Sequence, residues 1–139
     1  MGWGTMDSTT VLALDVGDKR IGMAIADDKT KIPRLLPTID VTDQILEQIA
    51  ELVTYEGIDR IVVGYPRNLS GEPTEQTAKV TSFVGQINQA IVTPTVYQDE
   101  SLTSVRAEEI LRSRGRPYTK SDIDAESAAL ILHDYLERL

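Results

Sequence analysis

Carboxylates at three places in the chain could hold a metal ion or move protons. Asp15 interrupts an apolar run, the pair Asp99-Glu100 follows a β-prone run, and Asp124 lies in an acidic stretch near the carboxyl end. An ionised carboxylate in a buried strand is costly unless a partner compensates its charge. Mg²⁺ and Mn²⁺ prefer oxygen ligands, and paired ions of this kind commonly hydrolyse phosphodiesters. Together the three places indicate a hard-cation site.

Each acidic place also has a purely structural interpretation. Asp15 could stand at the end of its strand, where water or a backbone amide satisfies it. Asp99 and Glu100 could simply form a polar strand end, and because they point to opposite faces of an extended chain, only one of them can face Asp15. Ser121 followed by Asp124 is typical of a capping box, in which the carboxylate serves the helix and its dipole rather than a metal.

Small residues beside Asp124 favour the functional interpretation. Small side chains let a helix approach a sheet closely, which would bring a carboxylate in the first helical turn against the strand that carries Asp15. The patch consists of Ala125, Ser127, Ala128 and Ala129.

The composition excludes several other chemistries. There is no cysteine, which rules out disulfides, cysteine nucleophiles, thiolate zinc sites and iron–sulfur clusters. The single histidine, His133, excludes a multi-histidine metal site, and we expect it at or near the surface of the last helix. Gly17 and Gly22 do not form a nucleotide-binding loop, because no helix follows the first strand.

The charge balance argues against a uniformly basic nucleic-acid binder. The chain has 14 basic and 22 acidic residues, a net charge of −8. Basic residues nevertheless gather between Lys19 and Arg34 and between Arg112 and Lys120, either as solvated surface or as a basic rim beside an acidic centre. Our candidate contacts to substrate phosphates are Lys19, Arg20, Arg67, Asn68, Arg114 and Arg116.

The elements that must position these residues follow from apolar spacing, turn residues and caps. We expect strands at 10–16, 20–26 and 35–40, a helix from Thr42 to Gly57, a strand at 60–64, a loop at 65–73, a helix from Thr74 to about Ile91, a strand at 95–98, a helix from Thr103 to Gly115, and a helix capped by Ser121 that runs to the carboxyl end.

A hairpin followed by alternating helices and strands predicts an α/β fold. Its mixed sheet has parallel strands and is covered by helices on both faces. The length of 139 residues indicates a single domain over 10–139, preceded by a loose tail at 1–9. No apolar run approaches ~18 residues, and the amino-terminal residues lack the pattern of a signal peptide, so we expect a cytoplasmic protein without a membrane partner.

Four stretches, in order along the chain, resemble the motifs of the YqgF family. Its members are Holliday-junction-resolvase-like proteins that are also described as pre-16S rRNA nucleases. The stretches are 14–22, 62–71, 99–104 and 124–129, and the resemblance runs from about Val11 to Leu136. Four ordered motifs are far more specific than any one of them. The third motif usually has an arginine where this chain has Ser101, and Arg67 or the basic residues of 112–120 could supply that charge instead.

The resemblance implies a ribonuclease-H-like mixed sheet with helices on both faces. It identifies Asp15, Glu100 and Asp124 as the catalytic and metal-binding residues of an Mg²⁺- or Mn²⁺-dependent nuclease. The implied substrate is structured RNA, the 5′ end of the small-subunit ribosomal RNA precursor, and the implied assembly is a monomer or homodimer.

Three other functions remain open at this point. A resolvase that cuts four-way DNA needs two active sites and hence a dimer. Asp15-Val16-Gly17 also resembles the first phosphate loop of actin-like ATPases, but those proteins place the nucleotide between two such domains. A non-catalytic RNA-binding assembly factor is the third alternative.

Overall fold

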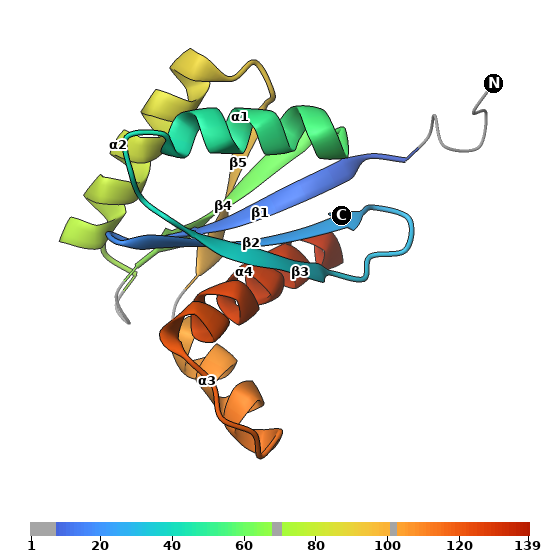
Figure 1. Cartoon of the computed structure of the whole chain (residues 1–139), viewed down its shortest axis with the longest axis vertical. Helices are drawn as coiled ribbons and strands as arrows, with labels where there is room; N and C mark the ends of the chain where they lie inside the picture. The colour runs from blue at the N-terminus through green and yellow to red at the C-terminus, as the bar shows by residue number, and fades with distance from the viewer. Residues whose placement is uncertain (1–7, 68–70, 101–102) are drawn as a thin grey trace.

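The protein folds as a five-stranded mixed sheet with helices on both faces, as predicted (Figure 1). The structure, a computed structural model, describes residues 8–67, 71–100 and 103–139. In chain order the elements are β1 (Thr10–Val16), β2 (Arg20–Asp27), β3 (Arg34–Asp40), α1 (Ile45–Glu56), β4 (Arg60–Pro66), α2 (Glu75–Ala90), β5 (Thr95–Glu100), α3 (Thr103–Ser113) and α4 (Lys120–Glu137). Of the expected amino-terminal tail, residues 1–7 lie outside the described residues, and the Thr9 amide donates a hydrogen bond to Asp28.

Strand order is what brings the carboxylates to one edge of the sheet. The order is β3-β2-β1-β4-β5, with β1 antiparallel to β2 and parallel to β4, and β4 parallel to β5. The carboxyl ends of β1, β4 and β5 therefore share one edge, where open α/β sheets place their sites. Strands β4 and β5 extend beyond the predicted 64 and 98, because Tyr65 pairs with Asp99 and Pro66 with Glu100.

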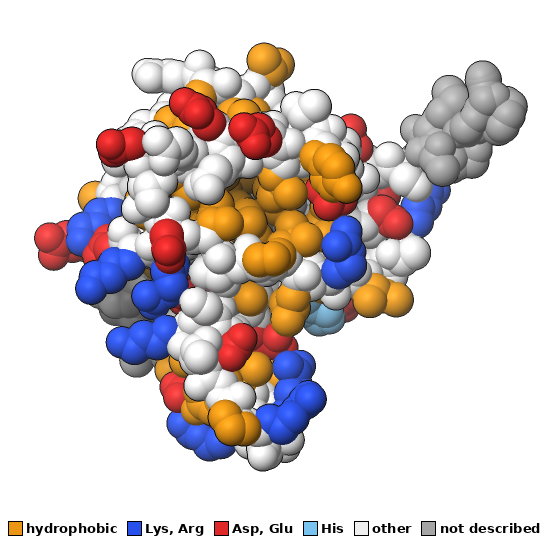
Figure 2. All heavy atoms as spheres, in the orientation of Figure 1, with side chains coloured by type: hydrophobic (Ala, Val, Ile, Leu, Met, Phe, Trp, Pro, Cys, Tyr) orange, Lys and Arg blue, Asp and Glu red, His pale blue; other side chains and the backbone are white. Residues whose placement is uncertain are grey.

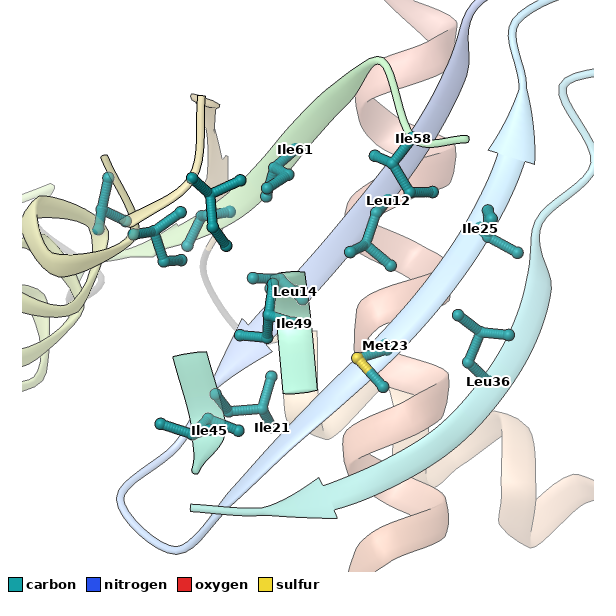
Figure 3. Close-up of a cluster of buried hydrophobic side chains, with 14 of the residues drawn as sticks. Leu12, Leu14, Ile21, Met23, Ile25, Leu36, Ile45, Ile49, Ile58 and Ile61 are labelled. Atoms are coloured by element: carbon teal, nitrogen blue, oxygen red, sulfur yellow. The ribbon is translucent and has the colours of Figure 1, made fainter. Parts of the chain in front are cut away.

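Two apolar layers hold the sheet between its helices. In the first, Ile45 and Ile49 of α1 lie over Leu14, Ile21 and Met23 of the sheet (Figure 3). In the second, α4 crosses the opposite face. The residues of this second layer are Val11, Ala13, Ala24, Ala26, Val62, Ala128, Ile131, Leu132, Tyr135 and Leu136. Helix α3 packs on α4 and extends away from the sheet in Figure 1.

Helix α4 approaches β2 closely because Gly22 has no side chain. A Cβ atom built on Gly22 would overlap the backbone carbonyl of Asp124 and lie 3.0 Å from the amide nitrogen of Ala125. Ala125, Ser127 and Ala128 on the same helix are buried, as the small-residue patch predicted. The first turns of α4 are thereby fixed against the strand that pairs with β1.

The amino-terminal cap of α4 differs from the prediction. Thr119 is the N-cap, and it forms a capping box with Asp122 rather than Ser121 forming one with Asp124. Thr119 has an extended backbone with φ −113° and ψ 174°, so Ser121 is already helical and cannot act as a cap. The Asp124 carboxylate is consequently not used in capping.

Of the two predicted ends of α1, the amino-terminal cap is wrong and the carboxyl-terminal glycine is confirmed. Thr42 is not its N-cap: the helix begins at Ile45 after Gln44, and no side chain caps it. The Thr42 hydroxyl accepts the Gln44 amide at 3.2 Å and closes the preceding turn instead. Gly57 ends the helix as predicted, with a left-handed φ of 66° that other residues rarely adopt. No helix in the described parts of the chain is long and apolar enough to cross a membrane.

Candidate active site

A cavity of about 350 Å³ opens at the sheet edge where β1, β4 and β5 end. Asp15, Glu100 and Asp124 all line it, although they come from β1, β5 and α4. Gly64 of β4 and Ile131 of α4 also line the cavity, next to each other. The tertiary fold thus brings the three predicted carboxylates to one cavity.

Asp15 and Asp124 form the closely interacting acidic pair of the cavity. Burial, and then repulsion by Asp124, raises the pKa of the Asp15 carboxyl to about 7. Among the described residues, no cationic side chain pairs with Asp15. A group of this kind gains from a bound cation, because a positive charge would compensate both desolvation and repulsion.

Asp124 is held by Arg20 from the β1–β2 hairpin. The Arg20 Nε donates to Asp124 Oδ2 at 2.7 Å, and the two side chains are 29% and 23% exposed. The Arg20 guanidinium is paired with an acid of the site, and its contact with substrate phosphate stays a prediction. It places a positive charge in direct contact with the acidic pair.

Glu100 is held by groups from α3 and α4 rather than by Asp15. The Thr103 hydroxyl donates to Glu100 Oε1, and Arg106 Nη1 lies 3.8 Å from the same oxygen and 3.0 Å from Asp134 Oδ2. Thr103 is the first residue of α3 rather than the predicted cap. Burial, together with the neighbouring Asp134, raises the pKa of Glu100 to about 7, against the opposing effects of Thr103 and Arg106.

The donor set suits a hard divalent cation in chemistry but is not closed around one. All three candidate ligands offer carboxylate oxygens, which Mg²⁺ and Mn²⁺ prefer. Within residues 8–67, 71–100 and 103–139, however, no three acidic or histidine side chains are grouped tightly enough to hold a metal ion. Asp15 and Asp124 lie together, whereas Glu100 is turned toward Arg106 and Asp134.

Comparison with known proteins assigns the chain to a family. The sequence profile of RuvX, described as Holliday junction resolvase, matches residues 9–138. The chain belongs to the RuvX family. A protein of Chloroflexus aggregans, provisionally named a pre-16S rRNA nuclease, is 41% identical over 136 residues, covering 95% of this chain and 96% of the relative. A Synechocystis protein with the same provisional name is 38% identical over 130 residues, covering 91% and 86%.

Solved structures show that this RuvX-family chain has the fold of Holliday junction resolvases. Thermus thermophilus RuvC in complex with a Holliday junction substrate matches with a TM-score of 0.59 at 17% identity, covering 94% of this chain and 96% of that chain. The fowlpox virus Holliday junction resolvase matches with a TM-score of 0.56 at 14% identity, covering 94% and 99%. The ribonuclease-H-like fold predicted from the sequence is confirmed.

The predicted phosphate contacts of this RuvX-family chain fall in different places. Arg67 lines the cavity, with 42% of its side chain exposed, and Lys19 is exposed at the β1–β2 turn. Figure 2 shows basic side chains gathered toward the end of the molecule where that turn lies and around the tip of α3. Asn68 and Ser101 lie outside the described residues.

Arg114 and Arg116 occupy a hollow separate from the carboxylate cavity. Both line a depression with Pro117, near the junction of α3 and α4. Arg114 Nη2 lies 3.0 Å from Oε1 of Glu126, whose side chain is only 9% exposed. Arg116 is exposed and, among the described residues, has no acidic partner. Arg114 therefore has a structural partner, and Arg116 carries the free charge of this loop.

Several residues of the site were not foreseen. Arg106 and Asp134 hold Glu100, and Gly22 sets the distance of α4 from β2. The position of Thr103, three residues after Glu100, was a local signal for that contact. No sequence signal linked Asp134 to Glu100, because the pairing depends on where α4 crosses the sheet. Asp99 is 67% exposed and lies 3.3 Å from Arg67, away from the acidic pair.

Proposed function

We propose that this chain is a divalent-metal-dependent nuclease that hydrolyses phosphodiester bonds of structured RNA. Its substrate is the 5′ end of the precursor of 16S rRNA, so that it works in ribosome biogenesis in the cytoplasm. The observation that carries the proposal is the repelling pair Asp15 and Asp124 in a cavity at the sheet edge. Relatives of nearly the same length that share about two-fifths of their residues carry the pre-16S rRNA nuclease name.

Asp15, Glu100 and Asp124 are the residues that would hold Mg²⁺ or Mn²⁺. When bound, such ions supply an activated water and stabilise the leaving 3′ oxygen. Asp15 must give up its proton to become a ligand, and its raised pKa makes that loss pH-dependent around neutrality. Asp124 would give up part of its contact with Arg20 to become a ligand. Thr103 and Arg106 hold Glu100 in place.

Arg67 supplies positive charge at the mouth of the cavity. It compensates for the Ser101 found where the family motif usually has arginine. Lys19 and Arg116 lie on the exposed surface and would engage phosphates farther from the cut, where contacts give affinity with little sequence information.

A cleavage panel tests the proposal. Precursor 16S rRNA, single-stranded RNA and a four-way DNA junction are incubated with Mg²⁺ or Mn²⁺ and with the Asp15→Asn, Asp124→Asn and Asp18→Asn variants. Asp18 is the matched control, since its carboxylate is 60% exposed and pairs with Lys79 at the surface. We expect cleavage of the precursor, lost by more than about 100-fold in the two site variants and kept in the control. Cleavage that survives Asp15→Asn would overturn the proposal.

Resolution of four-way DNA is the second candidate function. The family description and the fold of RuvC favour it. A resolvase cuts two strands symmetrically, so it requires two copies of this site in one dimer. Preferred cleavage of the junction together with a dimer mass in solution would select it.

Tight binding of precursor RNA, without cleavage in the presence of any metal ion, would instead select a non-catalytic assembly factor.

A further inference from the structure

Arg67, Tyr65 and Tyr97 form a contiguous row beside the cavity. The Arg67 guanidinium carbon lies 5.0 Å from the centre of the Tyr65 ring. The Tyr65 and Tyr97 rings meet edge to face, with their centres 5.0 Å apart and an angle of 65° between their planes. The row runs from the cavity, which Arg67 lines, to the edge strand β5, which carries Tyr97.

The backbone under this row is fixed. The Arg67 amide donates to the carbonyl oxygen of Glu100 at 3.2 Å, and Arg67 forms a bridge with Pro73. The Thr77 hydroxyl at the start of α2 donates to the carbonyl oxygen of Pro66. The position from which the Arg67 side chain leaves the sheet is therefore set by β5, α2 and Pro73.

The partner of Arg67 differs from the partners of the other arginines near the site. Arg20 and Arg114 are paired with acids whose side chains are 23% and 9% exposed. Arg67 pairs with Asp99, which is 67% exposed, and such surface pairs stabilise a fold very little. Of the described residues that line the cavity, Arg67 is the basic one. Its contacts orient a planar cation while leaving 42% of its side chain open.

A guanidinium placed over an aromatic ring, as Arg67 is over Tyr65, suits a planar ligand. Arginine stacks on rings and on nucleobases through its delocalised plane, which the point charge of lysine does not reproduce. A phosphate contact needs only a positive charge and no supporting ring. Fixing the plane in advance also lowers the entropy lost when a ligand stacks on it.

We propose that Arg67, supported by Tyr65 and Tyr97, is a stacking platform for one unpaired nucleobase of the RNA strand next to the bond that is cut. This inference rests on the proposed nuclease function and adds a requirement to it. The substrate must have at least one unpaired nucleotide beside the scissile phosphate, because a paired base cannot lay its face on the arginine.

Binding to base-deleted RNA tests the platform. A fluorescein-labelled single-stranded RNA of about 12 nucleotides is titrated in the Asp15→Asn background, so that it is bound without being cut. Abasic sites replace one nucleotide at a time, and Arg67→Lys keeps the charge while removing the plane. We expect Arg67→Lys to weaken binding of intact RNA about tenfold, with an unchanged salt slope, and to have almost no effect once one particular base is absent.

Control variants separate stacking from charge. Arg116→Lys alters an exposed arginine outside the cavity and should show no dependence on any single base. Tyr65→Leu should reproduce the base-dependent loss without changing the charge of the site. Parallel titrations of the unmodified chain and of Arg67→Lys in EDTA repeat the test without the Asp15 substitution. Equal losses on intact and abasic RNA, or full affinity with lysine, would show a phosphate contact and overturn the platform.

The two proposals can fail separately. Metal-dependent cleavage lost in Asp15→Asn, without coupling between Arg67 and a base, would retain the nuclease and remove the platform. Base-dependent binding through Arg67, without cleavage of any RNA, would retain the platform and remove the nuclease.

Discussion

Replacing Gly22 by alanine should separate α4 from the sheet and move Asp124. A Cβ atom at Gly22 would overlap the backbone carbonyl of Asp124 and lie 3.0 Å from the Ala125 nitrogen. These are backbone atoms of a helix, so no side-chain rotation can relieve the overlap. Either α4 shifts away from β2 or the strand bends, and each response disturbs packing against the second apolar layer.

The expected loss of stability for Gly22→Ala is about 3 kcal/mol, at the upper end of the usual cost of overpacking. For a domain of this size that lowers Tm by roughly 10 °C. Gly85 provides the opposite control, because it occupies an exposed position of α2 and its added Cβ would meet no atom within 4 Å beyond its own helix backbone and chain neighbours. Gly85→Ala should raise stability by about 0.5–1 kcal/mol through helix propensity.

Gly64→Ala tests the same reasoning at a position where a neighbouring side chain can move to relieve the overlap. Its Cβ would meet Ile131 Cδ1 at 2.6 Å, which is the end of a flexible side chain. The loss should be smaller than for Gly22→Ala, and Ile131→Val, which removes that atom, should recover part of it in the double variant.

Urea unfolding and thermal melting of these variants, with and without millimolar Mn²⁺, provide the assay. Gly22→Ala should also lose most of the stabilisation by Mn²⁺, because Asp124 is displaced from Asp15. If Gly22→Ala melts within about 2 °C of the parent protein, the close approach of α4 to β2 is not what positions Asp124, and the reasoning is refuted.

Three further predictions concern the charged groups. Burial raises the pKa of Asp15 from 3.8 to about 7, so the folded state keeps a proton that the unfolded chain loses. The free energy of unfolding should therefore fall as the pH rises from about 4 to 7. Urea midpoints measured at several pH values should show this fall, and Asp15→Asn should flatten it. Arg20→Gln should enlarge the rise in Tm caused by Mn²⁺, because Arg20 competes for Asp124; a smaller rise would mean that Arg20 aids metal binding. Arg114→Ala should lower the free energy of unfolding by roughly 1–3 kcal/mol, because it leaves the buried Glu126 carboxylate unpaired. Adding Glu126→Gln should restore part of that stability. Equal urea midpoints for Arg114→Ala and the parent protein would contradict this.

The sequence by itself determined the order of elements, the hairpin, the two-sided covering of the sheet and the edge at which the carboxylates meet. These features follow from local signals: apolar runs in β1 and β4, turn residues at 17–19, and the left-handed Gly57. Parallel pairing of β1, β4 and β5 then places Asp15 and Glu100 at one edge without further information. The family motifs added the prediction that Glu100, rather than Asp99, belongs to the candidate active site.

Only the tertiary structure decided the partner of each charged group in the site. Arg20 meets Asp124 across 104 residues of sequence, and Asp134 meets Glu100 because α4 crosses the sheet at the angle that Gly22 and Gly64 permit. Capping of α4 moved to Thr119 because the backbone becomes helical one residue after it. Such pairings depend on interhelical and helix–sheet distances of a few ångströms, set by close packing of side chains far apart in the chain, and local sequence patterns carry no record of those distances.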